Sequence, residues 1–428
     1  MERKNNGGKG YNTRYLKGLG SSDARLAKTF FSDMDKHQKD FAAQTIKDSE
    51  CIDMVFRKDR VPDRKKWLNS IDPLNTFFDY SKKEPIQITE FINKDMVLFS
   101  HYDVHRSIPS MTDGFKPSQR KIMFSCFKRK LTDEIKVAQL SGYVSENTSY
   151  HHGETSLQMA IVGMAQDFVG SNNINLLFPS GQFGTRRMMG SDSASARYIF
   201  TRLQKITRKI FHPDDDQILN YLDDDGTPIE PAFYVPVIPM ILTNSSIGIG
   251  TGWSTSIPGH NPQEIIQTLR NIITSKKSSS VLHPFYNGYK GEINKADSTI
   301  YEFVGKIESI PDRKRPSVRI TELPVGKSTA DYKAFIDAHM TGTEKGGKEG
   351  LWKDFVENHT DTTVDFTIIM KPEHFKKASK NLLKCFKLTS TTKTTNMHAF
   401  DENLNIKKYK SSADIMNEFT VHQDGGYE

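Results

Sequence analysis

The sequence has few cysteines, no long apolar run and no residue spacing typical of a metal site. Its 428 residues include three cysteines, Cys51, Cys126 and Cys385. Their odd number and wide separation argue against a disulfide framework or a zinc site. No apolar run approaches the ~18 residues of a membrane span, and the start "MERKNNGGKGYN" lacks the apolar core of a secretory signal. These absences predict a chain of the cytosol or nucleus with no membrane partner.

Positive charge is in excess. Lys and Arg number 59 against 52 Asp and Glu, which gives a formal net charge of +7. This balance favours an anionic partner, and nucleic acid is the leading candidate. The length is ample for several domains with buried cores.

The order of local patterns predicts several domains of mixed helix and strand. Residues 1–60 contain a strand, a glycine turn and a helix, and residues 61–85 are charged and punctuated by proline, as in a connector. Residues 86–260 carry most of the helical periodicity, whereas 261–410 contain clustered β-formers between Pro and Gly turns. Residues 411–428 begin a helix that loses its periodicity in a polar tail.

The stretch "SDSASARYIFTRLQKITRKIF", residues 191–211, predicts a basic helix with a tyrosine beside its apolar stripe. Four residues recur at helical spacing and form the predicted buried stripe: Ile199, Leu203, Ile206 and Ile210. Tyr198 is about a hundred degrees away around the helix. Three cations share its predicted face: Arg202, Lys205 and Lys209. Such a face suits a phosphate backbone, and the alternative is a boundary tyrosine on a solvated basic helix.

A second basic cluster opens the segment "DGFKPSQRKIMFSCFKRKL". Pro117 suits the first position of a helix because its φ is fixed and it has no N–H. Lys116, Arg120 and Lys121 gather at that end. Free backbone N–H groups and cations there predict an anion site, with a plain solvated face as the alternative.

The pair His151 and His152, followed by Gly153, stands at the start of a helix predicted over "ETSLQMAIVGMAQDF". Adjacent histidines lack the i, i+4 geometry of a helical zinc pair, and no cysteine is near. Hydrogen bonding to phosphate is therefore favoured over metal binding. A histidine that caps the helix or satisfies a local carbonyl is the competing interpretation.

Alternating glycines mark the segment "NSSIGIGTGWSTSIP". No Lys-Ser/Thr pair follows in Walker fashion, so a nucleotide loop is disfavoured. Glycine at alternate positions permits close backbone approach to a large partner, with Ile247 and Ile249 exposed on the loop. Apolar wedges on such loops can enter DNA base steps.

Together these segments resemble the breakage-reunion core of the eukaryotic-type type IIA DNA topoisomerases, including those of large DNA viruses. The resemblance runs from about Arg14 to Phe419 through ordered motifs: "YLKGLGSS", "RSIPSMTDGFKPSQRK", "KVAQLSGYVSENTSYHHGE", "FVGSNNINLLFPSGQFGTR", "SASARYIFTRL", "TRKIFHP", "PMILTNSSIGIGTGWST" and "NMHAFD". It implies an α+β multidomain fold, with a winged-helix DNA-cleavage domain at 86–260 and an α/β tower domain at 261–410. It also implies the end of a TOPRIM domain in 1–60 and the truncated start of a coiled-coil arm in 411–428.

The resemblance also implies roles for single residues. Tyr198 is implied to be the nucleophile that attacks a DNA phosphate and leaves a 5′-phosphotyrosyl end, with Arg197 and His152 acting at the same phosphate. A phenol with a pKa near 10 needs such neighbours to act as a nucleophile at neutral pH. Ile249 is implied to intercalate and bend the DNA. The implied DNA-contacting set is Arg106, Asp113, Lys116, Arg120, Lys17 and Arg202.

Family resemblance further implies an ATP-hydrolysing, Mg²⁺-dependent homodimer that acts on double-stranded DNA, in the nucleus or, for a virus, the host cytoplasm. The glutamate and D-x-D pair that hold Mg²⁺ in the TOPRIM domain are not found in these residues, nor is an ATPase domain. The expectation is no metal site here and an ATPase/TOPRIM region supplied in cis or in trans. The chain is then a piece of a longer enzyme, a subunit that needs a second chain, or a DNA-binding remnant without catalysis.

Overall fold

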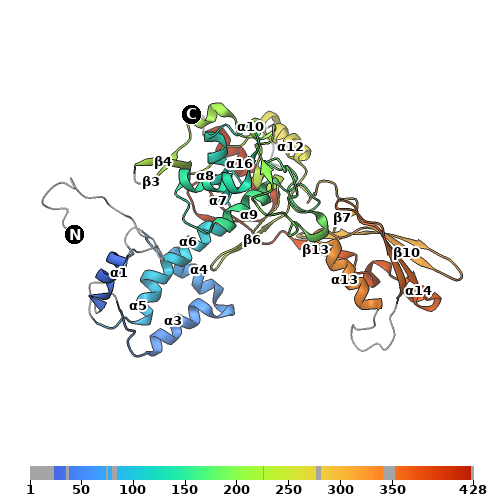
Figure 1. Ribbon diagram of the computed structural model, residues 1–428, viewed down its shortest axis with the longest axis horizontal. Coiled ribbons are helices and arrows are strands. Elements are labelled where there is room, and N and C mark those ends of the chain that lie inside the picture. The colour runs from blue at the N-terminus through green and yellow to red at the C-terminus, as the bar shows by residue number, and fades with distance from the viewer. Residues whose placement is uncertain are drawn as a thin grey trace. The chain divides into compact units, whose positions relative to one another are not determined.

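The computed structural model describes residues 24–34, 38–73, 76–79, 84–224, 226–275, 281–340 and 352–425. It divides into two units, Met1–Ser100 and His101–Glu428, and each is described by itself (Figure 1). Lys17, with the predicted strand and glycine turn around it, lies outside the described residues. Within those ranges, no helix is both long and apolar enough to cross a membrane.

The first unit is helical. Its elements are α1 (Ala24–Phe31), α3 (Ile46–Phe56), η1 (Lys58–Arg60), α4 (Val61–Asn69), α5 (Ile88–Phe91), the π-helical turn η2 (Ile92–Met96) and the start of α6 (Val97–Ser107). The predicted connector at 61–85 therefore begins as a helix. In that helix Arg64 is buried and donates to the carbonyls of Met54, Val55 and Arg57, at the end of α3. The unit also extends beyond residue 86, where the winged-helix domain was expected to begin.

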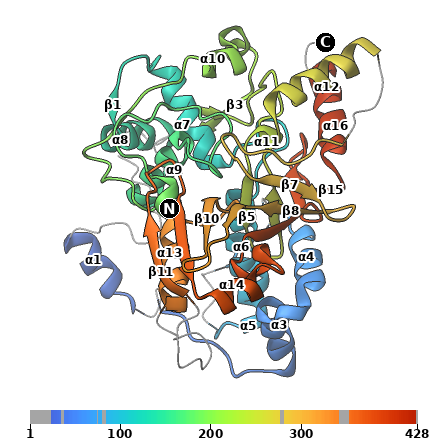
Figure 2. The same ribbon diagram turned by 90° about the vertical axis from the view of Figure 1, so that its right-hand side faces the viewer.

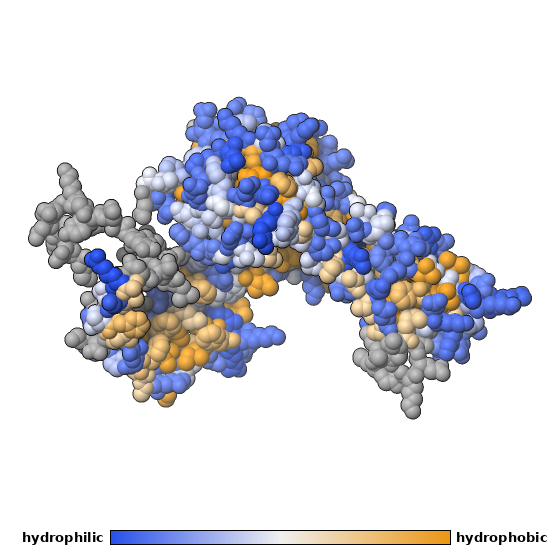
Figure 3. All heavy atoms as spheres, viewed as in Figure 1, coloured by the Kyte–Doolittle hydropathy of each residue, from blue (hydrophilic) through white to orange (hydrophobic). Residues whose placement is uncertain are grey.

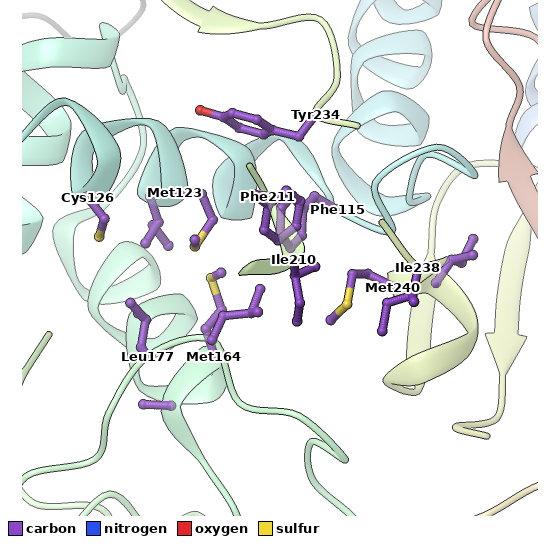
Figure 4. Packing of buried hydrophobic residues seen from close by; sticks show 14 of the residues in the cluster. Phe115, Met123, Cys126, Met164, Leu177, Ile210, Phe211, Tyr234, Ile238 and Met240 are labelled. Carbon is purple, nitrogen blue, oxygen red and sulfur yellow. The ribbon is translucent and has the colours of Figure 1, made fainter. Parts of the chain in front are cut away.

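Three helices form the centre of the second unit: α7 (Pro117–Lys128), α8 (Val137–Thr148) and α9 (Glu154–Ala165). Met123 and Cys126 of α7 and Met164 of α9 are buried in one core, which Figure 4 shows from close by. Phe115 and Phe211 stack beside them, with ring centroids 5.4 Å apart. Shorter helices complete this region: η3 (Arg186–Met188), α10 (Thr207–Ile210), η4 (Pro213–Gln217) and α11 (Met240–Thr243).

The second unit also contains antiparallel strand pairs. They are β1 (Ile135–Lys136) with β2 (Phe200–Thr201), β3 (Tyr221–Asp224) with β4 (Thr227–Pro231), β5 (Ser246–Ile249) with β6 (Ser254–Ile257), and β14 (Met397–Phe400) with β15 (Ile406–Tyr409). Of these strands, β1 and β4 contact the central helices. Helices α12 (Pro262–Ser275) and α16 (Ser412–Gly425) lie side by side (Figure 2). The helix predicted at the C-terminal end is present, and its Ile415, Met416 and Phe419 are buried in the same core.

The tower region contains the strands expected from "TIYEFVGKIESI", "PSVRITELP" and "TTVDFTIIM". One sheet has the order β11-β12-β10-β9 and the other β13-β8-β7. Their bounds are β7 (Glu292–Lys295), β8 (Ile300–Val304), β9 (Lys306–Ile310), β10 (Ser317–Glu322), β11 (Trp352–Glu357), β12 (Phe366–Met370) and β13 (Thr389–Lys393), with α13 (Thr329–Met340), α14 (Pro372–Ala378) and α15 (Leu382–Cys385). A second core joins Val318 and Phe366 of the sheet to Ile336 of α13. A buried ion pair between Arg186 and Glu322 ties η3 to the end of β10.

The prediction of a helix around Tyr198 is wrong. Of that stretch, only α10 (Thr207–Ile210) is helical, whereas the residues before it form a turn and the extended strand β2. Ile199 and Leu203 are buried, as expected, but Ile206 is exposed. Phe200 pairs with Lys136 on one side and with Ser180 on the other, so cross-strand pairing outweighs the helical periodicity.

The part of the second unit's surface that faces the viewer in Figure 3 is mainly hydrophilic, with scattered apolar side chains. Exposed single apolar residues are normal on a folded protein. Ile247 and Ile249, both on the short strand β5, are exposed apolar residues of this unit.

Candidate DNA-cleavage site

Tyr198 is held on a turn that points its side chain outward. The residues on either side are buried, Ala196 at 9% and Ile199 at 1% exposed, whereas Tyr198 is 72% exposed. The carbonyls of Ala196 and Ile199 accept hydrogen bonds from the backbone N–H groups of Ala138 and Val137, at 3.0 Å each. These N–H groups belong to the first turn of α8, which has no partners for them within the helix. The start of α8 therefore fixes the backbone on both sides of the tyrosine.

Cations lie beside Tyr198 along the chain. Arg197 is exposed, and its guanidinium makes no hydrogen bond or ion pair within the described ranges. Arg202 is half-buried and stacks on the ring of Phe178, with its guanidinium carbon 4.2 Å from the ring centroid. Lys205 and Lys209 are exposed, as predicted. Lys205 lies in a turn and Lys209 on α10, so neither shares a helix with Tyr198 and the predicted single basic face is not formed.

His152 belongs to a compact aromatic cluster. Its Nε2 is hydrogen-bonded to the hydroxyl of Tyr102, and the ring of Tyr150 lies edge-on at 5.3 Å between centroids. Burial raises the pKa of both tyrosines, whereas the positive charge of Arg106 opposes that rise. His152 and Arg106, two predicted site residues, are thus brought together. No hydrogen bond or ring contact joins His152 to Tyr198 within the described residues.

Sequence reasoning missed Tyr102 and Tyr150. Tyr150 directly precedes the histidine pair, and Tyr102 is four residues before Arg106, on the same face of α6. These spacings were the only sequence signal that placed the two tyrosines near predicted site residues. It could not show that α6 packs beside the loop before α9, because that contact joins segments 50 residues apart.

Asp113 and Arg120, both predicted DNA contacts, form a buried ion pair in this structure. Asp113 is 0% and Arg120 8% exposed. The Nε of Arg120 donates to Oδ2 of Asp113 at 2.7 Å, and its Nη2 donates to Oδ1 at 3.0 Å. Burial lowers the pKa of Arg120, but the charge and hydrogen bonds of Asp113, together with the charge of Glu230, raise it by more, so the net shift is upward. Lys121 likewise forms an ion pair within the fold, with Glu230.

Lys116 is the remaining cation of that predicted cluster. Its ammonium donates to the carbonyl of Ile247 at 2.6 Å, and burial lowers its pKa. The segment predicted as a glycine loop is the β5–β6 hairpin, and Lys116 fastens its first strand. The predicted exposure of Ile247 and Ile249 is confirmed, at 68% and 80%.

Comparisons with known proteins show the family of this chain. A family model for the A subunit of DNA gyrase/topoisomerase IV matches residues 106–428, and one described as the C-terminal associated domain of TOPRIM matches residues 1–104. The chain belongs to the type IIA DNA topoisomerases. The join between the two matches lies close to the boundary of the two structural units.

Curated relatives and a solved structure resemble most of this chain. DNA topoisomerase 2 of Arabidopsis thaliana is 46% identical over 415 residues, which are 96% of this chain and 28% of that protein. DNA topoisomerase 2 of Saccharomyces cerevisiae is 46% identical over 407 residues, 95% of this chain and 28% of that protein. The Plasmodium falciparum topoisomerase II DNA-binding, cleavage and re-ligation domain has 45% identity and a TM-score of 0.83, over 96% of this chain and 55% of that one. The chain thus spans little more than a quarter of these curated relatives.

The acidic side chains of the described residues do not assemble a metal site. In the described part of the chain no group of three or more His, Cys, Asp or Glu side chains could hold a metal ion. The acidic run at Asp214–Asp216 forms η4, and its last carboxylate pairs with Arg208 at 2.7 Å. These residues therefore do not fit the Mg²⁺ that the family uses.

Proposed function

We propose that this chain is the DNA-gate region of a type II DNA topoisomerase, which binds and bends double-stranded DNA and transiently cleaves it through Tyr198. The observation that carries the proposal is the presentation of Tyr198: an exposed phenol between two buried residues, on a backbone fixed by the start of α8. A nucleophile held in this way meets a phosphate without a costly rearrangement.

In the proposed reaction the hydroxyl oxygen of Tyr198 attacks a DNA phosphorus, and the bond from phosphorus to the 3′ oxygen of the preceding nucleotide breaks. The tyrosine loses its proton, and the departing 3′ oxygen gains one. The 5′ phosphate remains on the enzyme as a phosphotyrosine. Resealing is the reverse attack, which keeps the free energy of the broken phosphodiester in the covalent bond.

Arg197 is proposed to stabilise the charge on the transferring phosphoryl group, because it directly precedes Tyr198 and its guanidinium has no partner within the described ranges. His152 is proposed to hydrogen-bond the same phosphate, with Tyr102 orienting its ring. Arg106, Arg202 and Lys116 are proposed DNA contacts. Asp113 and Arg120 are proposed instead to stabilise the fold that carries these residues, because their charges pair with each other in the interior.

Mg²⁺, ATP hydrolysis, dimer formation and a nuclear location are proposed from family membership. Mg²⁺ would neutralise charge that develops on the phosphate and the leaving oxygen. We assign the metal and ATP to an ATPase/TOPRIM region that works with this chain in cis or in trans. The competing function is a DNA-binding remnant without catalysis, which the excess of positive charge would also serve.

A relaxation assay tests the proposal. Supercoiled plasmid is incubated with Mg²⁺, ATP and the chain, with and without a family ATPase/TOPRIM chain. Relaxation is expected only in the complete mixture and is expected to be lost with Tyr198→Phe. DNA binding without relaxation in the complete mixture would favour the remnant, and relaxation by Tyr198→Phe would reject Tyr198 as the nucleophile.

A further inference from the structure

The β5–β6 hairpin exposes two isoleucines on the same face of one strand. Ile247 and Ile249 are two residues apart on β5, so their side chains point the same way. They are 68% and 80% exposed. Gly248, between them, faces the other side of the strand and is buried. The family resemblance marks Ile249 as a DNA wedge and leaves Ile247 without a role.

The opposite face of β5 lies directly on α6. A Cβ added at Gly248 would overlap the carbonyl oxygen of Ser107, and one added at Gly250 would lie 3.1 Å from the Cα of Val104. The glycines are thus required by this close approach. Because the strand is backed by a helix, the isoleucine face cannot turn inward.

Further contacts hold the hairpin in place. Asp103 of α6 accepts from the backbone N–H and the hydroxyl of Thr251, at 2.9 and 3.0 Å. On the partner strand, the backbone carbonyl of Ser254 contacts Nδ1 of His398 at 2.9 Å. At the other end, the ammonium of Lys116 donates to the carbonyl of Ile247 itself. The backbone that carries Ile247 and Ile249 is therefore fixed, and the ammonium of Lys116 lies against the carbonyl of Ile247.

Strand geometry limits what the second isoleucine does. Successive residues rise about 3.4 Å, so the Cα atoms of Ile247 and Ile249 are separated by about 7 Å. Side chains at that distance do not enter the same base step. An apolar wedge enters from the minor groove and opens the duplex toward the major groove, which leaves sugar and base edges accessible beside it.

We propose that Ile247 is a second DNA contact, which packs against the sugar and base edges of the minor groove beside the step opened by Ile249. This inference rests on the proposed DNA-gate function. DNA is favoured over a protein partner because a cation lies at the foot of the strand, where phosphates flank the groove. Lys116 acts as a positioning residue, since it fixes the backbone that carries Ile247.

The test compares Ile247→Ala, Ile249→Ala and the double variant in the 428-residue chain. The matched control is Ile273→Ala, because Ile273 is 64% exposed on α12, away from β5. Affinity for a duplex is measured at fixed salt, and bending is measured by fluorescence transfer between labelled duplex ends. Thermal melting confirms that each variant is folded. Sedimentation of the free chain shows whether any variant changes self-association.

Ile249→Ala is expected to lose most of the bending. Ile247→Ala is expected to weaken binding by about tenfold through lost apolar burial, and to reduce bending less. Ile247→Glu is expected to weaken binding further because its carboxylate faces phosphates, whereas Ile273→Ala and Ile273→Glu match the parent chain.

The outcomes separate the two proposals. If Ile249→Ala loses bending while Ile247→Ala and Ile247→Glu bind and bend like the parent chain, the second contact is rejected and the DNA-gate function stands. A change in self-association with unchanged DNA binding would also reject it, in favour of a protein partner. If the parent chain neither binds nor bends DNA, both proposals fail.

Discussion

Replacing Arg120 distinguishes a structural role from a DNA-binding role. In the intact chain Arg120 makes two hydrogen bonds to Asp113 and a third to the carbonyl of Phe115, at 3.2 Å. In Arg120→Ala each carboxylate oxygen of Asp113 keeps one backbone donor, from Phe115 at 2.9 Å and Tyr234 at 3.0 Å. A completely buried negative charge then has no cation beside it.

The expected cost is about 3–5 kcal/mol of unfolding free energy, as for other buried pairs that lose one partner. Arg106→Ala is the matched control because Arg106 is exposed, and it is expected to change stability by no more than about 0.5 kcal/mol. Urea unfolding followed by circular dichroism measures both. A double variant, Arg120→Met with Asp113→Leu, is expected to recover part of the loss because no charge remains buried.

For DNA binding, Arg106→Ala is expected to have the larger effect and Arg120→Ala the smaller one. Arg106→Ala should reduce the slope of log affinity against log salt by about 1, as for the loss of one phosphate contact. Folded Arg120→Ala, measured at low temperature, should keep the parent slope. A stable Arg120→Ala chain with a reduced slope would refute the structural role and place Arg120 on the DNA.

Three further predictions concern other parts of the second unit. Burial lowers the pKa of His260 from 6.5 to about 4, so the fold keeps its full stability above pH 6.5 and loses about 3 kcal/mol progressively as pH falls from 6.5 to about 4. His260→Gln should flatten this part of the stability curve measured by urea unfolding, and an unchanged curve would contradict it. Gly248→Ala should disturb the hairpin and lower the melting temperature, whereas Gly142→Ala in α8, with nothing within 4 Å of the added Cβ, should raise stability by up to about 1 kcal/mol; equal melting shifts would show that the hairpin is not seated on α6. Tyr102→Phe should slow cleavage about tenfold in the complete mixture by removing the hydrogen bond that orients His152, with DNA affinity unchanged, and an unaffected cleavage rate would remove Tyr102 from the site.

Patterns confined to one element were predicted well. The start of α7 at Pro117 and the start of α9 after the histidine pair follow from helix-end rules and are both present. The exposure of Ile249 also follows from local alternation. The α+β class and the tower strands were correct for the same reason, because each depends on a period within a few residues.

Features decided by distant partners were not predicted. The stretch from Ile199 to Ile210 has helical spacing, yet its first half pairs with Lys136 and Ser180 as an extended strand. Arg120 looked like an exposed cation because its partner Asp113 is seven residues away, on a turn whose burial the sequence does not show. Tyr102 escaped notice because its contact with His152 depends on packing.

The most direct measurement of the central claim is the position of the covalent bond to DNA. The chain is incubated with an end-labelled duplex, Mg²⁺ and a family ATPase/TOPRIM chain, then denatured rapidly to trap the adduct, digested with protease and analysed by mass spectrometry. The account predicts a nucleotide attached through its 5′ phosphate to the oxygen of Tyr198, and no adduct from Tyr198→Phe. An adduct on another side chain of this chain, or an undiminished adduct from Tyr198→Phe, would contradict it.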